Sequence, residues 1–285
     1  IRRPPRSTQG VSSAASDVYK RQVLKIAVEA GREILDIYEK DYEVIEKADG
    51  SPVTVADHRA HELISRQLEP LIPQTPVLSE ESSGITVDER MRWQRFWLVD
   101  PLDGTKEFIK RNGEFTVNIA LIEAGLPVLG VVHTPVQKLS HFGSAGQGAW
   151  RRIEGSSAER IEVSRYGGGA ARMVVSRSHS GPAVERFRDA LAECSGHNVE
   201  MISMGSALKV CLVAEGSADV YPRLGPTSEW DTGASHCILN ESGGRVIDCA
   251  GSTLQYNKPN LVNPWFMAVG DPHYDWIGVC PELAG

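Results

Sequence analysis

The sequence predicts a layered α/β protein with a mixed sheet in each half. Two helical patterns come first, at 23–38 and from residue 54, where apolar residues recur every three or four positions. Strand-like runs at 116–123 and 127–133 then flank a short turn that contains glycine, as in a β-hairpin. Beyond residue 169, short apolar runs alternate with helical patterns, which is typical of sheets covered by helices.

The elements of the first half follow in chain order. The first helix is expected from Val23 to Tyr38, and Thr54-Val55-Ala56-Asp57 has the pattern of a capping box that begins a second helix. The next expected elements are strands at 76–78 and 96–99, the hairpin 116–123/127–133 with its turn at Ala124-Gly125, and a second hairpin region within 139–150.

The second half begins after a glycine-rich loop at 166–169. Strands are expected at 173–176, 200–203, 218–222, 244–247 and 266–269, and helices at 183–193, 206–215 and from about Asp231 to Glu241. The predicted division is therefore an N-terminal half at 23–168, which carries most of the candidate metal ligands, and a C-terminal half at 169–285, which completes the site.

Residues 1–22 differ from the rest of the chain and are predicted to be a tail outside the fold. The segment begins with Ile1, is rich in serine and proline, and has several arginines and lysines against a single acid, Asp17. A transit peptide has such a composition. The favoured interpretation is a translated cloning or adaptor remnant.

Composition restricts the function. The formal net charge of −7 predicts no general affinity for nucleic acid, so an anionic substrate must be bound by local cations or metals. No run of about 18 apolar residues predicts a transmembrane helix. The five cysteines show no CxxC spacing, which favours free thiols in the cytoplasm. Peripheral association with an inner membrane and the oligomeric state stay open.

Acidic residues follow two of the predicted strands. Asp100-Pro101-Leu102-Asp103-Gly104-Thr105 continues the apolar run 96–99, and Glu80-Glu81 follows 76–78. A further acid, Asp231, lies beside Trp230. Several carboxylates at strand ends are the hard oxygen ligands that Mg²⁺ prefers, and two such ions about 3.5–4 Å apart are the usual arrangement for displacement at phosphorus. The sequence therefore predicts a metal-dependent phosphatase.

These motifs resemble those of the inositol monophosphatase-like, lithium-sensitive Mg²⁺ phosphatases. The resemblance rests on Trp97 to Thr105, Trp230-Asp231-Thr232-Gly233-Ala234, Leu78 to Glu81 and Ser51 to Asp57, in that family's order, and spans 23–285. Within the family, Lys106 to Asn118, Ser176 to His179, Ser206 to Lys209 and Tyr221 to Arg223 are most similar to CysQ-type 3'(2'),5'-bisphosphate nucleotidases of sulfur metabolism. The resemblance implies an αβαβα sandwich, the sugar-phosphatase fold, and hydrolysis of 3'-phosphoadenosine 5'-phosphate to AMP and phosphate.

The resemblance also implies roles for individual residues. Two or more Mg²⁺ ions are expected per site, one held by Glu80, Asp100 and the carbonyl of Leu102, and one held by Asp100, Asp103 and Asp231. Asp57 and Thr105 form the candidate catalytic pair, because a threonine hydroxyl that donates to a carboxylate can accept from the attacking water. Pro101 and Gly104 predict a tight turn after Asp100 that leads into a helix start, and this turn offers the N–H groups of Gly104 and Thr105 to a phosphate.

Substrate binding is expected on the same surface. The resemblance places Glu80, Leu102, Gly104, Thr105, Ser176, His179, Gly205, Lys209 and Asp231 in contact with substrate. The second phosphate of a nucleotide bisphosphate needs a second cation, which Lys209, Arg223 or Lys106 can supply. Two alternatives stay open, namely an inositol- or sugar-phosphate phosphatase on the same fold and a non-catalytic nucleotide-binding module.

Overall fold

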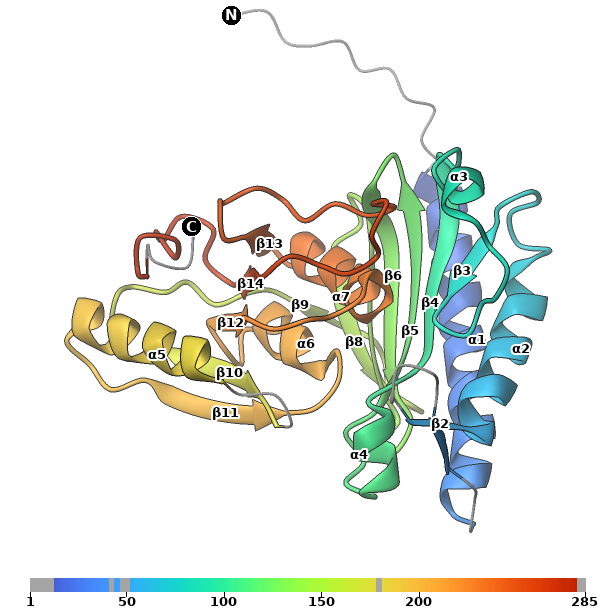
Figure 1. The fold of residues 1–285 in the computed structure, drawn as a ribbon, viewed down its shortest axis with the longest axis horizontal. Helices are drawn as coiled ribbons and strands as arrows, with labels where there is room; N and C mark the ends of the chain where they lie inside the picture. The colour runs from blue at the N-terminus through green and yellow to red at the C-terminus, as the bar shows by residue number, and fades with distance from the viewer. Residues whose placement is uncertain (1–12, 41–43, 47–51, 178–180, 281–285) are drawn as a thin grey trace, which may run out of the picture.

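The computed structural model describes residues 13–40, 44–46, 52–177 and 181–280, without the side chains of 13–17, 44–46 and 52–53. These residues stack in layers of helices, sheet, helices, sheet and helix (Figure 1). The predicted layered α/β fold with two mixed sheets, and the αβαβα sandwich that the resemblance implied, are confirmed.

The first sheet has seven strands in the order β3-β4-β5-β6-β7-β8-β9. Only the β3–β4 pair is parallel, and the other neighbours are antiparallel. The strands are β3 Val77–Ser79, β4 Arg95–Asp103, β5 Thr116–Glu123, β6 Leu126–Thr134, β7 Leu139–Ser144, β8 Ala149–Ile153 and β9 Glu159–Ile161. A separate two-stranded ribbon joins β1 Val44–Glu46 to β2 Pro52–Thr54.

Both faces of β4 are covered, which explains its continuous apolar run. Trp97 and Val99 pack with the outer helices α1 (Ser13–Tyr38) and α2 (Val55–Leu68), whereas Phe96 and Leu98 pack with the inner layer. The first helix begins at Ser13 and not at Val23. The predicted helix start at Val23 was therefore wrong, because α1 already includes residues of the segment 1–22.

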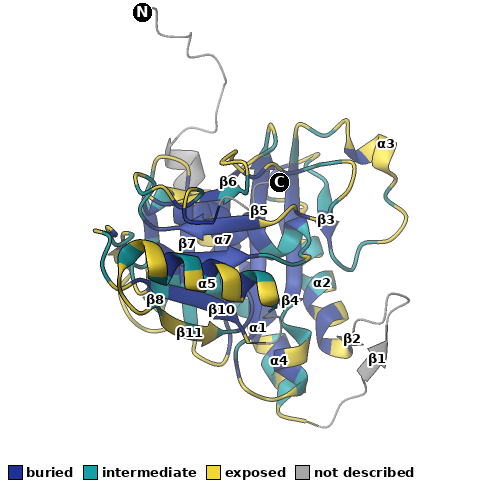
Figure 2. Cartoon of the chain, turned by 60° about the vertical axis from the view of Figure 1, so that its left-hand side comes forward, coloured by how far each residue is buried: buried dark blue, intermediate teal, exposed yellow. Residues whose placement is uncertain are grey.

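The second sheet has the order β11-β10-β12-β14-β13 and is also mixed. Its strands are β10 Arg172–Ser176, β11 Glu200–Met204, β12 Val220–Arg223, β13 Arg245–Asp248 and β14 Phe266–Val269. Helix α5 (Pro182–Ser195) covers its outer face and exposes its own outer side (Figure 2). The link between the two sheets, 162–171, contains the predicted division at 168/169.

Helices α6 (Leu208–Ala214) and α7 (Glu229–Glu241) lie between the sheets and carry residues into the site (Figure 1). Most of α7 is buried, and its backbone packs directly on β6. A Cβ at Gly130 would lie 2.2 Å from the carbonyl oxygen of Ala234, so only glycine permits this approach. In the described part of the chain, no helix is long and apolar enough to cross a membrane.

Candidate active site

A β-bulge turns two acids of β4 toward one cavity. Asp100 pairs with Asn118 and Asp103 with Thr116, so three steps along β4 oppose two steps along β5. The N–H of Leu102 donates to Asp100 Oδ1 at 3.1 Å, and Asn118 Nδ2 donates to Asp103 Oδ2 at 3.2 Å. The expected strand end at Val99 was wrong, because pairing with β5 continues through Asp103.

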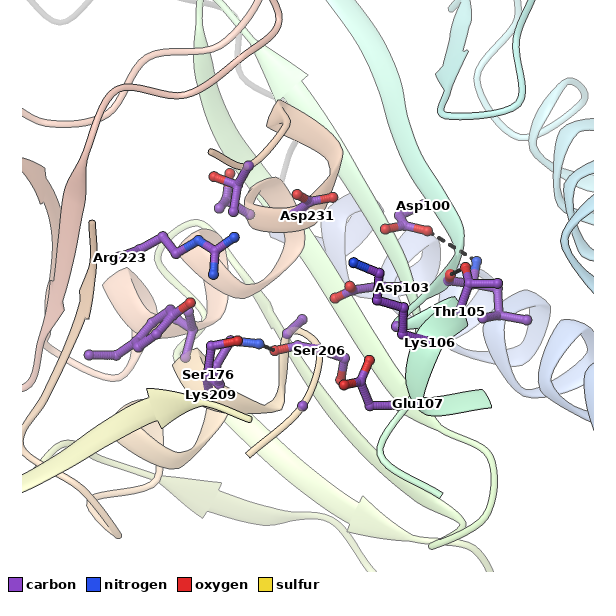
Figure 3. Close-up of a pocket in the computed structure, with 18 of the residues that line it drawn as sticks. Asp100, Asp103, Thr105, Lys106, Glu107, Ser176, Ser206, Lys209, Arg223 and Asp231 are labelled. Atoms are coloured by element: carbon purple, nitrogen blue, oxygen red, sulfur yellow. Dashed lines mark hydrogen bonds between the residues drawn. The ribbon is translucent and has the colours of Figure 1, made fainter. Parts of the chain in front are cut away.

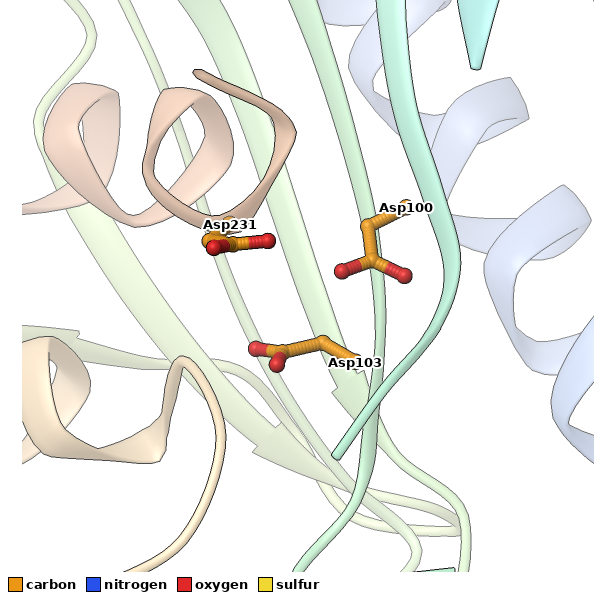
Figure 4. Close-up of side chains that lie close together, drawn as sticks. All are labelled: Asp100, Asp103 and Asp231. Carbon is orange, nitrogen blue, oxygen red and sulfur yellow. The ribbon is translucent and has the colours of Figure 1, made fainter. Parts of the chain in front are cut away.

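Asp231 reaches the same place from the start of α7. Its Oδ2 accepts the backbone N–H of Ser228 at 2.8 Å, which is the return bond of a capping box. Carboxylate oxygens of Asp100, Asp103 and Asp231 lie within 4.8 Å of one another (Figure 4). We call these three residues the acidic trio. The structure thus places Asp231 beside two acids that lie 128 and 131 residues earlier in the chain.

Burial and close approach disfavour negative charge on the carboxylates of the acidic trio, because these charges lose water and repel one another. Burial, followed by the charges of Glu80 and Asp103, raises the pKa of Asp100 well above its ordinary value. Burial and Asp103 raise the pKa of Asp231 to about 8, and burial also raises the pKa of Asp103. A divalent cation would offset this repulsion, and a donor set made only of oxygen atoms fits a hard cation such as Mg²⁺.

The two remaining predicted metal ligands lie at the edge of the same cavity. Glu80 follows β3, and its N–H donates to the carbonyl oxygen of Val99 at 3.1 Å. The carbonyl oxygen of the buried Leu102 lies 3.3 Å from the hydroxyl oxygen of Thr105. All five predicted metal ligands therefore border one cavity.

Asp57 and Thr105 meet as the sequence predicted. Thr105 begins the short helix α4 (Thr105–Ile109), and its hydroxyl donates to Asp57 Oδ1 at 3.3 Å. The other carboxylate oxygen of Asp57 accepts both the N–H and the hydroxyl of Thr54, each at 2.7 Å. Burial raises the pKa of Asp57, and the bonds from Thr54 oppose that shift. Gly104 precedes α4 with a φ of 92°, which favours glycine there.

Across the cavity lie residues of the second half (Figure 3). Ser176 ends β10, Gly205 follows β11 and Lys209 lies on α6. The Lys209 amine donates to the carbonyl oxygen of Ser206 and lies 5.6 Å from the centre of the Tyr221 ring. Burial lowers the pKa of Lys209, and the negative charge of Asp103 acts in the opposite direction.

Some cavity residues were not predicted to touch substrate, and one prediction is not tested. Besides the predicted residues, Ser206 (expected beside Ser176 and Gly205) and the alternative cations Lys106 and Arg223, the wall contains Glu107, Ala207, Val210, Tyr221, Thr227, Thr232 and Phe266. The place of Glu107 in the cavity wall could have been predicted from the sequence, because Glu107 directly follows Lys106 at the start of a helix. His179 lies outside the described residues.

Comparisons with known proteins agree with this architecture. The model of the inositol monophosphatase family matches residues 16–270. The chain belongs to the inositol monophosphatase family. Its match begins inside the segment 1–22, as helix α1 does.

Curated members of the family are similar over most of the chain. The 3'(2'),5'-bisphosphate nucleotidase CysQ of Salmonella typhimurium is 48% identical over 248 residues, which are 86% of this chain and 97% of that protein. The protein of the same name from Escherichia coli K12 is 47% identical over 249 residues, again 86% and 97% of the two chains.

Solved structures of the family share the fold. The crystal structure of CysQ from Bacteroides thetaiotaomicron aligns with a TM-score of 0.78 at 44% identity, covering 89% of this chain and 97% of that one. An inositol monophosphatase from Anabaena aligns with a TM-score of 0.73 at 23% identity, covering 94% and 96%. The second likeness supports the fold alone.

Proposed function

We propose that this chain is a Mg²⁺-dependent 3'(2'),5'-bisphosphate nucleotidase that hydrolyses 3'-phosphoadenosine 5'-phosphate to AMP and phosphate. The observation that carries the proposal is the acidic trio facing the half-buried Lys209 across one cavity. A substrate with two phosphate groups needs both a metal site for the scissile group and a separate cation for the other. The similarity to proteins named as such nucleotidases supports the substrate class.

In this proposal Glu80, Asp100 and the Leu102 carbonyl hold one Mg²⁺, and Asp100, Asp103 and Asp231 hold another. When bound, these ions supply positive charge to the phosphoryl oxygens and lower the pKa of water. Asp57 and Thr105 orient the attacking water, because the Thr105 hydroxyl donates to Asp57 and keeps its lone pairs for a water proton. The N–H groups of Gly104 and Thr105 face the scissile phosphate.

The groups that contact the rest of the substrate come from the second half. Lys209 pairs with the second phosphate, and Ser176, His179 and Gly205 line the adenosine side. The substrate is a small molecule, and no nucleic-acid partner is proposed. Because the cysteines of the described chain, Cys194, Cys211, Cys237, Cys249 and Cys280, are free thiols, we place the protein in the cytoplasm.

Phosphate release from 3'-phosphoadenosine 5'-phosphate and from inositol 1-phosphate, measured over a Mg²⁺ titration, tests the proposal. We expect strict Mg²⁺ dependence and a higher kcat/KM for the bisphosphate. Asp103→Asn keeps the side-chain shape but removes one ligand charge, so it should lower activity roughly 10²–10⁴-fold. A higher kcat/KM for inositol 1-phosphate would favour the inositol phosphatase instead, and no phosphate release from either ester would favour a binding module.

A further inference from the structure

Glu114, in the loop between α4 and β5, is one of the residues at which the two sides of the cavity meet. Its carbonyl oxygen lies between two glycines. A Cβ at Gly104 would be 3.2 Å from this oxygen, and a Cβ at Gly205 would be 2.8 Å from it. The loop that carries Asp103 and the loop that leads to Lys209 therefore both pack against Glu114, and glycine permits the closer approach.

The carboxylate of Glu114 binds the second half directly. Its Oε2 accepts the N–H of Gly205 at 2.8 Å and Arg177 Nε at 2.8 Å, and its Oε1 accepts Arg177 Nη2 at 2.6 Å. Arg177 Nη2 also donates to the carbonyl oxygen of Ser203 at 3.1 Å. The guanidinium of Arg177, which binds both carboxylate oxygens like a fork, and the N–H of Gly205 thus fix the carboxylate of Glu114 from two directions.

Through these contacts, only a few bonded residues and hydrogen bonds separate the acidic trio from Lys209. Gly205 is followed by Ser206, whose carbonyl oxygen accepts the Lys209 amine. Ser206 has a φ of 46°, which is uncommon for a residue with a side chain, so its position depends on the contacts around it. On the other side, Gly104 is bonded in the chain to Asp103 and Thr105.

We propose that Glu114 is a positioning residue that fixes the distance between the metal site and Lys209, and thereby selects substrates with two phosphate groups at the matching separation. This inference rests on the function proposed above. A substrate that reaches both sites tolerates little error in their spacing, because a displacement of about 1 Å can cost about 10²-fold in rate. A substrate with one phosphate needs only the metal site.

A merely structural ion pair would behave differently. The side chain of Glu114 is 15% exposed and that of Arg177 is 42% exposed, so solvent screens the pair and its loss should cost little stability. Any loss of stability would lower the activity on all substrates alike. The test therefore compares two substrates that differ only in the second phosphate.

The experiment measures kcat/KM for 3'-phosphoadenosine 5'-phosphate and for adenosine 3'-monophosphate at saturating Mg²⁺. Glu114→Gln keeps the shape but weakens the bonds to Arg177 and Gly205. We expect a loss of about tenfold on the bisphosphate and less than about twofold on the monophosphate. In a Lys209→Ala background, Glu114→Gln should add less than about twofold, because its effect acts through Lys209.

Two further variants complete the design. Arg177→Lys keeps the charge but cannot form the fork, so it should cause the same substrate-selective loss even where Glu114→Gln fails to fold. Glu159→Gln removes an exposed ion pair with Arg151 on β8 and β9 and serves as the matched control, with no change expected on either substrate.

Equal losses on both substrates, or an undiminished loss in the Lys209→Ala background, would overturn the inference and leave the proposed function intact. Failure of the wild-type protein to hydrolyse the bisphosphate would overturn the proposed function and this inference with it. That outcome is distinguishable, because it appears in the wild-type rate before any variant is compared.

Discussion

Asp57 and Asp231 occupy the same local position but different surroundings. Each is the third residue of its helix, α2 or α7, and each accepts the backbone N–H of the residue that caps it. The distances are 2.7 Å from Thr54 and 2.8 Å from Ser228. In both helices the first turn favours a negative side chain, because unpaired N–H groups point toward it.

The two carboxylates differ in their other neighbours. The second oxygen of Asp57 accepts the Thr105 hydroxyl, whereas the carboxylate of Asp231 lies against Asp100 and Asp103 (Figure 4). The pKa of Asp231 accordingly rises to about 8, with Asp103 as the largest cause after burial. In the function proposed above, one capping arrangement thus prepares two carboxylates for different tasks, orienting a hydroxyl and binding a cation, and the neighbouring residues decide which task each has.

The largest effect is expected from Asp231→Asn. The amide oxygen can still accept the N–H of Ser228, so α7 should keep its start, but one ligand charge is lost. We expect kcat/KM for the bisphosphate to fall roughly 10²–10⁴-fold. Circular dichroism and phosphate release at saturating Mg²⁺ measure the two consequences separately. Near-normal turnover by the folded variant would contradict a role of Asp231 in metal binding, since Asp231 would then be only a helix cap.

A smaller effect is expected at the hydroxyl that Asp57 binds. Thr105→Val removes the donor at nearly constant shape, and kcat should fall about 10- to 100-fold because the water loses its orientation. Thr105→Ser keeps the hydroxyl and should retain most of the activity. The apparent affinity for Mg²⁺ should not change in either variant. If valine and serine gave the same kcat, the pairing of Asp57 with Thr105 would have no catalytic meaning.

Local patterns predicted most of the elements. The capping box at Thr54, the hairpin 116–123/127–133 and the alternation beyond residue 169 agree with the structure to within a few residues. Each of these depends on neighbours in the sequence, where periodicity and turn chemistry are readable. The acids of the trio were also found from sequence, because strand ends and the family motifs marked them.

Features that depend on distant contacts were not predicted. Pro101 and Gly104 indicated a turn, but pairing with β5 keeps the strand going through a bulge. One miss was local instead: the start of α7 was expected near Asp231, although the capping pattern Ser228-Glu229-Trp230-Asp231 could have been read from the sequence. No local signal shows that Glu114 meets Arg177 and Gly205, which lie 63 and 91 residues further along the chain.

The smallest effect tests the cap of α2 itself. The Thr54 hydroxyl donates to Asp57 and accepts from the N–H of Ala56 at 3.1 Å. Thr54→Ala should therefore cost about 1 kcal/mol of unfolding free energy, or about 2–4 °C in Tm. Thr86→Ala is a matched control, since Thr86 caps the short helix α3 (Val87–Arg90) by accepting the N–H of Glu89 at 3.2 Å on an exposed surface.

Only the variant at Thr54 should also change the pH dependence of kcat. The bonds from Thr54 lower the pKa of Asp57, so removing the hydroxyl raises that pKa further. In the proposed mechanism Asp57 works as an unprotonated acceptor, so a higher pKa of Asp57 means that activity begins to fall at a higher pH as the solution is acidified. The acidic limb of the profile should therefore move to higher pH in Thr54→Ala and stay in place in Thr86→Ala. If both variants lose stability alike and neither profile moves, the cap of α2 supports the helix without tuning Asp57, and the two carboxylates differ less than their surroundings indicate.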